Sequence, residues 1–119
     1  MLRTHIENIG DVAIIECEGR IVQSEAAFQL RDAVTAQKDA RVVVLDLSEV
    51  SSIEGGGLGM LWYLQRWAQD NDVRLKLFNP AGRVRDRLCN VNSMLQFEIT
   101  TPAEMTALVA GSSRFPLAA

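Results

Sequence analysis

The segment from Arg41 to Leu47, RVVVLDL, is a nearly continuous run of β-branched and other apolar residues. Alternate residues of a strand point to opposite faces of a sheet, so this run would place apolar side chains on both faces. That pattern is typical of a strand buried in the middle of a sheet whose two faces are both covered. The segment therefore predicts a domain built around one central sheet with helices packed against it.

Three further segments have strand patterns. Residues 12–17 alternate, with Ala13, Ile15 and Cys17 on one face, and a short strand at residues 3–8 precedes the turn at Gly10. So short a connection forces these two strands to be antiparallel, because a parallel pair needs a crossover. Residues 73–77 alternate as well, and residues 96–99 add a short strand. We expect a mixed sheet of about four to five strands.

Helical patterns separate these strands. The first helix is predicted to begin at the N-cap Ser24 and to end near Lys38. The second runs from Gly55 to about Asp70, and its wide apolar arc predicts that Trp62 belongs to the core. The apolar stripes are Ala26, Ala27, Leu30, Ala33 and Val34 on the first helix, and Leu58, Met60, Leu61, Tyr63, Leu64, Trp67 and Ala68 on the second.

Capping signals predict two more helices. Asn79 and Pro80 supply an N-cap and a first helical residue for a third helix. Thr101-Pro102-Ala103-Glu104 is a capping box that opens the last helix. The prediction is a single α/β domain, an α+β sandwich with about four helices. It spans residues 1–110, and residues 111–119 form a flexible tail.

Composition excludes several classes of function. With 12 Lys and Arg against 15 Asp and Glu and a net charge of −3, the chain lacks the basic surface of a nucleic-acid binder. One His and two Cys cannot supply a zinc site, and we expect neither a metal nor a cofactor. The N-terminus resembles no signal peptide and no apolar stretch could insert into a bilayer. We therefore expect a cytoplasmic protein.

Four glycines cluster where the second helix should begin, at Gly55, Gly56, Gly57 and Gly59. Each costs a helix about 1 kcal/mol relative to alanine, so a benefit should offset them. Three interpretations remain open. The bare amides could hold a phosphate, although a Gly-Lys-Ser/Thr sequence is missing. A partner or another backbone could approach closely, or the helix could pack tightly on its own sheet.

The segment from Asp46 to Gly59, DLSEVSSIEGGGLG, resembles the strand, loop and helix-start signature of STAS domains. In bacterial anti-sigma factor antagonists of this family the pattern is D-x-S-x-V followed by D-S-S-G-L-G. The order of elements over most of the chain is similar too. The resemblance implies a non-enzymatic module that binds a serine-kinase-type anti-sigma factor. That kinase phosphorylates the second serine of D-S-S-G, and the added charge releases the complex.

This chain departs from the family pattern at the decisive residue. Glu54 matches the acidic position and Gly55 the first serine, whereas Gly56 falls on the phosphoacceptor and has no hydroxyl. The resemblance therefore implies a partner-binding protein that is not phosphorylated there. The expected contact surface comprises Ser48, Ser51, Ser52, Glu54, Gly55, Gly56, Gly57 and Leu58.

Several alternatives stay open. Ser51 and Ser52 either organise the loop or replace the missing phosphoacceptor, and Asp46 is interpreted as a loop-organising carboxylate. Phe28 either packs under a loop or contacts a partner. Single STAS domains also serve as cytoplasmic subunits of lipid-trafficking ABC transporters, which is the alternative function. A homodimer remains possible.

Overall fold

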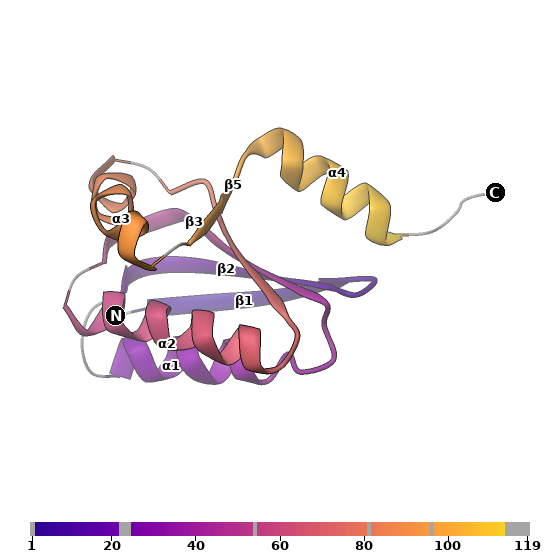
Figure 1. The fold of residues 1–119 in the computed structure, drawn as a ribbon, viewed down its shortest axis with the longest axis horizontal. Coiled ribbons are helices and arrows are strands. Elements are labelled where there is room, and N and C mark those ends of the chain that lie inside the picture. Colours follow the sequence, from indigo (N-terminus) through magenta and orange to yellow (C-terminus); the bar gives the residue numbers. More distant parts are fainter. Residues whose placement is uncertain (1, 22–24, 54, 81, 96, 114–119) are drawn as a thin grey trace.

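The computed structural model describes residues 2–21, 25–53, 55–80, 82–95 and 97–113. The elements follow one another as predicted, two strands first and then alternating helices and strands (Figure 1). They are β1 (Leu2–Ile9), β2 (Val12–Ile21), α1 (Glu25–Thr35), β3 (Val42–Ile53), α2 (Gly56–Asp70), β4 (Arg74–Phe78), α3 (Gly82–Leu95), β5 (Glu98–Thr100) and α4 (Pro102–Ser113).

The five strands form one sheet in the order β1-β2-β3-β4-β5. β1 pairs antiparallel with β2, and the other neighbours are parallel, which confirms the predicted mixed sheet. β3 lies in the centre. Its residues Val43, Val44 and Leu45 are completely buried, as the apolar run predicts.

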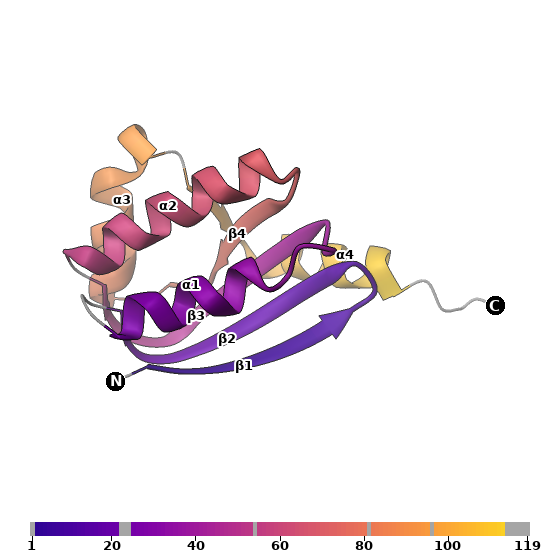
Figure 2. The ribbon, with the colours of Figure 1, turned by 90° about the horizontal axis from the view of Figure 1, so that it is seen from below.

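Helices cover both faces of the sheet. α1 and α2 lie side by side over one face, and α4 lies on the opposite side (Figures 1 and 2). The larger core fills the space under α1 and α2 and includes Val84 and Leu88 of α3. The smaller core contains Val12, Ile14, Val42 and Val44, against which Met105, Leu108 and Val109 of α4 pack.

β3 is longer than the sequence predicts. The expected loop at residues 48–54 is strand as far as Ile53, because β2 extends to Ile21 and pairs with it. The pairing shifts register between Glu16 and Glu18 and again after Gly19, which marks a bulge or irregularity. The predicted loop was therefore wrong, and its serines lie on a strand.

The two capping signals had opposite outcomes. In the capping box, the Thr101 N–H donates to Glu104 Oε1 at 2.9 Å and the Glu104 N–H donates to Thr101 Oγ1 at 3.1 Å, so that prediction is confirmed. The Asn79-Pro80 prediction was wrong. Asn79 follows β4 with a left-handed backbone of φ +55°, which differs from the extended conformation of an N-cap, and α3 begins at Gly82.

Helix ends and exposed aromatic residues bring further corrections. α1 ends at Thr35, and the predicted cap Ser24 is outside the described residues. α4 continues through Ser113, so the first part of the expected tail is helical; residues 114–119 are not described. Trp62 and Tyr63 are 46% and 48% exposed, so placing them in the core was wrong. None of the described helices is both long and apolar enough to cross a bilayer.

Candidate partner-binding surface

The connection from β3 to α2 ends in a bare helix start. Gly55 precedes the helix with φ +51°, a left-handed conformation that favours glycine, and its carbonyl accepts the Gly59 N–H at 3.2 Å. The N-cap residue is thus a glycine, which has no side-chain oxygen to bond the first amides of the helix. Gly56, the first helical residue, is exposed to solvent. Glu54 lies outside the described residues.

Gly57 explains part of the glycine cluster. It is buried, and a Cβ built on it would overlap the carbonyl oxygen of Ile21 at the end of β2. Tight packing of α2 on its own sheet, one of the three interpretations, is therefore confirmed at this residue. Gly59 differs, because a Cβ there would meet nothing within 4 Å. Packing within the chain accounts for Gly57 and backbone conformation for Gly55, but neither accounts for Gly59.

An exposed stripe continues from the glycines along α2. Gly56, Gly59, Trp62, Tyr63 and Arg66 recur at helical spacing and all are exposed. The Arg66 guanidinium lies over the Trp62 ring, with its central carbon 6.0 Å from the ring centroid. We call these five residues the α2 stripe. Its first two residues are glycines without side chains, and large aromatic side chains follow about one turn later.

Phe28 on the neighbouring α1 is 52% exposed, and the Arg31 guanidinium stacks on its ring at 5.0 Å. The ring therefore has no loop packed over it among the described residues. Of its two interpretations, packing under a loop was wrong. Contact with a partner stays a prediction.

The three serines do not form one cluster. Ser48 donates from both its backbone N–H and its hydroxyl to Asp46 Oδ1, at 3.0 and 2.6 Å, which supports the local structural role expected of Asp46. The exposed Ser51 hydroxyl donates to the Gly19 carbonyl on β2 at 3.2 Å. Ser52 is half-buried and faces a hollow beside α3.

That hollow, of about 270 Å³, adjoins the residue that ends β3. Ser52 and Ile53 form one wall, and α3 supplies Arg83, Asp86, Arg87 and Asn90. Arg85 lies between Arg83 and Arg87 in the chain but does not line the hollow. The spacing of four residues between Arg83 and Arg87 was the signal that could have shown this.

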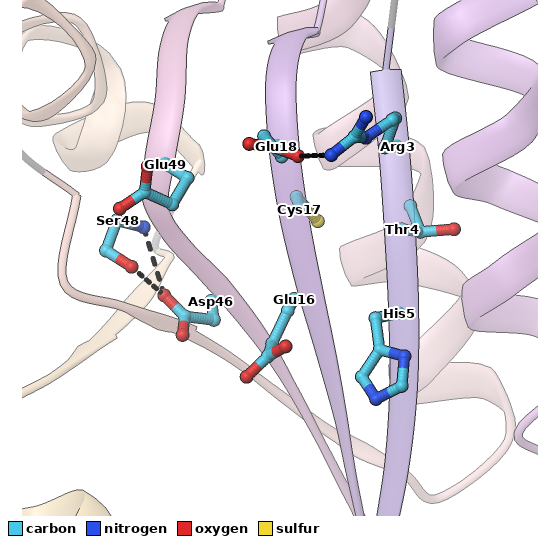
Figure 3. A pocket seen from close by; sticks show the side chains of 9 residues that line it. All are labelled: Arg3, Thr4, His5, Glu16, Cys17, Glu18, Asp46, Ser48 and Glu49. Carbon is cyan, nitrogen blue, oxygen red and sulfur yellow. Dashed lines mark hydrogen bonds and ion pairs between the residues drawn. The ribbon is translucent and has the colours of Figure 1, made fainter.

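A second hollow, of about 390 Å³, opens on the sheet face opposite α1 and α2 (Figure 3). Ser48 and Asp46 belong to it, so Ser48 lies apart from Ser52. Arg3 pairs there with Glu18 at 2.6 Å. The remaining lining residues are Thr4, His5, Glu16, Cys17 and Glu49. Among the described residues, no His, Cys, Asp and Glu side chains are grouped to hold a metal ion.

The family model described as the STAS domain matches residues 3–103. The anti-sigma factor antagonist from Mycobacterium paratuberculosis has a similar fold, with a TM-score of 0.74 at 21% identity over 92% of this chain and 93% of that one. The unphosphorylated antagonist SpoIIAA gives a TM-score of 0.68 at 16% identity, covering 92% and 97% of the two chains.

A transporter gives a third similar structure. Murine Slc26a9, an anion transporter, has a TM-score of 0.71 at 17% identity, and the match covers 88% of this chain but only 18% of that one. A search of the curated proteins finds no match.

Proposed function

Because the chain belongs to the STAS domain family, we propose that it is a non-enzymatic regulatory module that binds a protein partner through the α2 stripe and the residues leading into it. The partner is a serine-kinase-type anti-sigma factor, and the setting is partner switching in a bacterial cytoplasm. The antagonist structures with the same fold support this choice of partner.

One observation carries the proposal. Gly56 and Gly59 are exposed at the start of α2, and open space surrounds the missing side chain of Gly59. An exposed glycine costs a helix about 1 kcal/mol without any gain from packing. A partner that lies close against the helix start would supply the missing gain, because it approaches the backbone where no side chain intervenes.

Phosphate does not regulate this surface in the way that the resemblance implies for other members. Gly56 stands at the expected acceptor position and has no hydroxyl. Ser51 is the more exposed of the two possible substitute acceptors, and its hydroxyl donates a hydrogen bond to the Gly19 carbonyl. The protein therefore stays in its binding-competent state, because a kinase that binds it cannot release the complex by phosphorylating residue 56.

The test is binding between the full chain and the serine-kinase-type anti-sigma factors of its own genome, measured by calorimetry. We expect one of them to bind. Incubation with that kinase and ATP, followed by mass spectrometry, should find no phosphate between Ser48 and Gly59. Binding to none of the kinases contradicts the proposed partner, and phosphate in that segment contradicts the permanently competent state.

We infer as a second candidate a cytoplasmic STAS subunit of a lipid-trafficking ABC transporter, and the occurrence of this fold in an anion transporter supports a role in transport. Murine Slc26a9 contains a region with this fold inside a much longer chain. An affinity pull-down from native lysate distinguishes the two functions by the identity of the captured protein. A kinase-fold protein supports the first, whereas an ABC transporter ATPase overturns it in favour of the second.

A further inference from the structure

The two edges of the sheet differ strongly. β5, at one edge, has only three residues, and helices precede and follow it closely in the chain. β1, at the other edge, has eight residues that pair with β2 in unbroken register from Leu2 to Ile9. In Figure 2, β1 lies at the border of the sheet, and none of the described elements pairs with its outer side.

Natural proteins usually protect a long edge strand from pairing with another chain. They do so with proline, charged side chains, a bulge or a covering segment. β1 contains no proline, its register with β2 shows no shift, and its two charged residues, Arg3 and Glu7, have opposite signs. Its backbone therefore presents a regular row of amides and carbonyls that a further strand can join.

The charges on β1 are complementary to a second copy of β1. Two such strands related by a two-fold axis and centred on His5 would place Arg3 opposite Glu7 of the other copy. The two-fold symmetry forms this pair twice, so two Arg–Glu ion pairs lie on the same face of the sheet. On the face covered by α1, Ile6 would lie opposite Thr4, and Ile6 is 39% exposed in the single chain. Cross-strand pairs of these kinds stabilise antiparallel sheets.

Both charged side chains are accessible for this role. Arg3 binds Glu18 within its own chain, but its side chain is 75% exposed, and a guanidinium has donors for a second carboxylate. Glu7 is exposed, and its neighbour on β2 is the uncharged Ile14. We propose that the protein forms a homodimer in which β1 pairs antiparallel with β1 of a second copy, with His5 at the two-fold axis. This interface is separate from the α2 stripe and does not depend on the proposed function.

Cross-linking tests the register. In the full chain with Cys89→Ser, which removes the exposed native thiol, His5→Cys would face its own copy across the axis. Directly opposed residues of antiparallel strands have Cα atoms about 4.5–5.5 Å apart, which suits a disulfide. We expect mild oxidation to convert this variant to covalent dimer at least about tenfold faster than Glu7→Cys, which would face Arg3 instead. Equal, slow rates for the two variants overturn the proposal.

Charge reversal tests the interface without a cysteine. Sedimentation equilibrium of the unmodified chain, from low micromolar to millimolar concentration, should show a dimer. Glu7→Arg should weaken it by about tenfold or more, because like charges would then face each other twice. Arg3→Glu should do the same, and an equal mixture of the two variants should recover the dimer as a heterodimer. Circular dichroism verifies that each variant is folded.

The sedimentation results either support or overturn the proposed β1 dimer. A chain that remains monomeric at the highest concentration overturns the proposal. A dimer that neither reversal weakens overturns it too, because such a dimer must use another surface. A dimer weakened by both reversals and restored in the mixture supports it.

Discussion

Gly57 at the start of α2 lies directly against the carbonyl oxygen of Ile21 at the end of β2, with no room for a Cβ between them. This contact fixes the first turn of the helix on the sheet. The exposed glycines on either side of it are therefore presented on a firmly held backbone.

The contact makes residue 57 intolerant of any side chain. We expect Gly57→Ala to destabilise the protein by about 3 kcal/mol, because the carbonyl belongs to a paired strand and cannot move away cheaply. Gly59→Ala is the matched control, since it adds the same methyl group in open space two residues later. It should stabilise the helix by about 1 kcal/mol. Urea unfolding of both variants measures the difference, and equal stability would contradict the close contact.

A negative charge at the exposed start of α2 should weaken partner binding. We expect Gly56→Asp to reduce the affinity by about tenfold or more, because a buried, unpaired charge is costly in an interface. Ala103→Asp is the control, since it adds the same charge to an exposed residue in the first turn of α4. Calorimetry with the identified kinase measures both. Equal affinities for the two variants would place the interface elsewhere.

Restoring a hydroxyl should restore regulation. We expect the kinase to phosphorylate Gly56→Ser but not the unmodified chain, and the phosphorylated product to lose the partner through its added charge. Mass spectrometry and a binding assay after the kinase reaction test both steps. Gly59→Ser is a suitable control, because it offers a serine three residues away on the same exposed stripe. Equal modification of the two serines would argue against a specific acceptor position.

Hydrogen bonds in the capping box should make α4 sensitive to acid. The bonds that Glu104 makes with Thr101, first with its backbone and then with its side chain, hold the pKa of the Glu104 carboxyl below its usual 4.5. Because this pKa is lower in the folded protein than in the unfolded chain, the ionised carboxyl stabilises the helix at any pH above the unfolded-state pKa. This stabilisation is lost as the pH falls through the lowered pKa of the folded protein. The protection factors of the α4 amides, which compare their exchange with the intrinsic rate of an unfolded chain at the same pH, should therefore fall below about pH 4.5. Glu104→Gln should remove most of this pH dependence; an unchanged profile would contradict the role of Glu104.

The two cysteines should differ in reactivity. Burial, and to a lesser degree the charge of Asp46, raises the pKa of Cys17 to about 12, so its thiol stays protonated and unreactive. Cys89 is exposed. Iodoacetamide at mildly alkaline pH should add one group to the native protein and two after denaturation, as measured by intact mass. Native Cys89→Ser should take up none, and labelling of that variant would show that Cys17 is accessible.

Local signals predicted the fold well where the interacting residues are neighbours in the chain. Thr101 and Glu104 form their capping box because both partners lie within one turn. Asn79 carried a similar signal, but its left-handed backbone differs from the extended conformation that an N-cap adopts. The apolar run at Val42–Leu45 identified the central strand, because consecutive apolar residues place apolar side chains on both faces of a strand.

The candidate site was harder to predict, because it depends on partners far away in the chain. The segment with the serines at 48, 51 and 52 has the sequence pattern of a loop. It is a strand because β2, some thirty residues earlier in the chain, pairs with it. Trp62 was predicted as core because a wide apolar arc does not reveal how much of a helix its neighbours cover. The role of Gly57 needed the position of Ile21, which periodicity cannot provide.

The unequal lengths of the outer strands limit how many molecules can associate. An edge pairing that joins β1 to β1 consumes the same surface on both copies, and the outer strands that remain are the three-residue β5 strands. Such a contact closes on itself. Association through β1 alone would therefore stop at two chains.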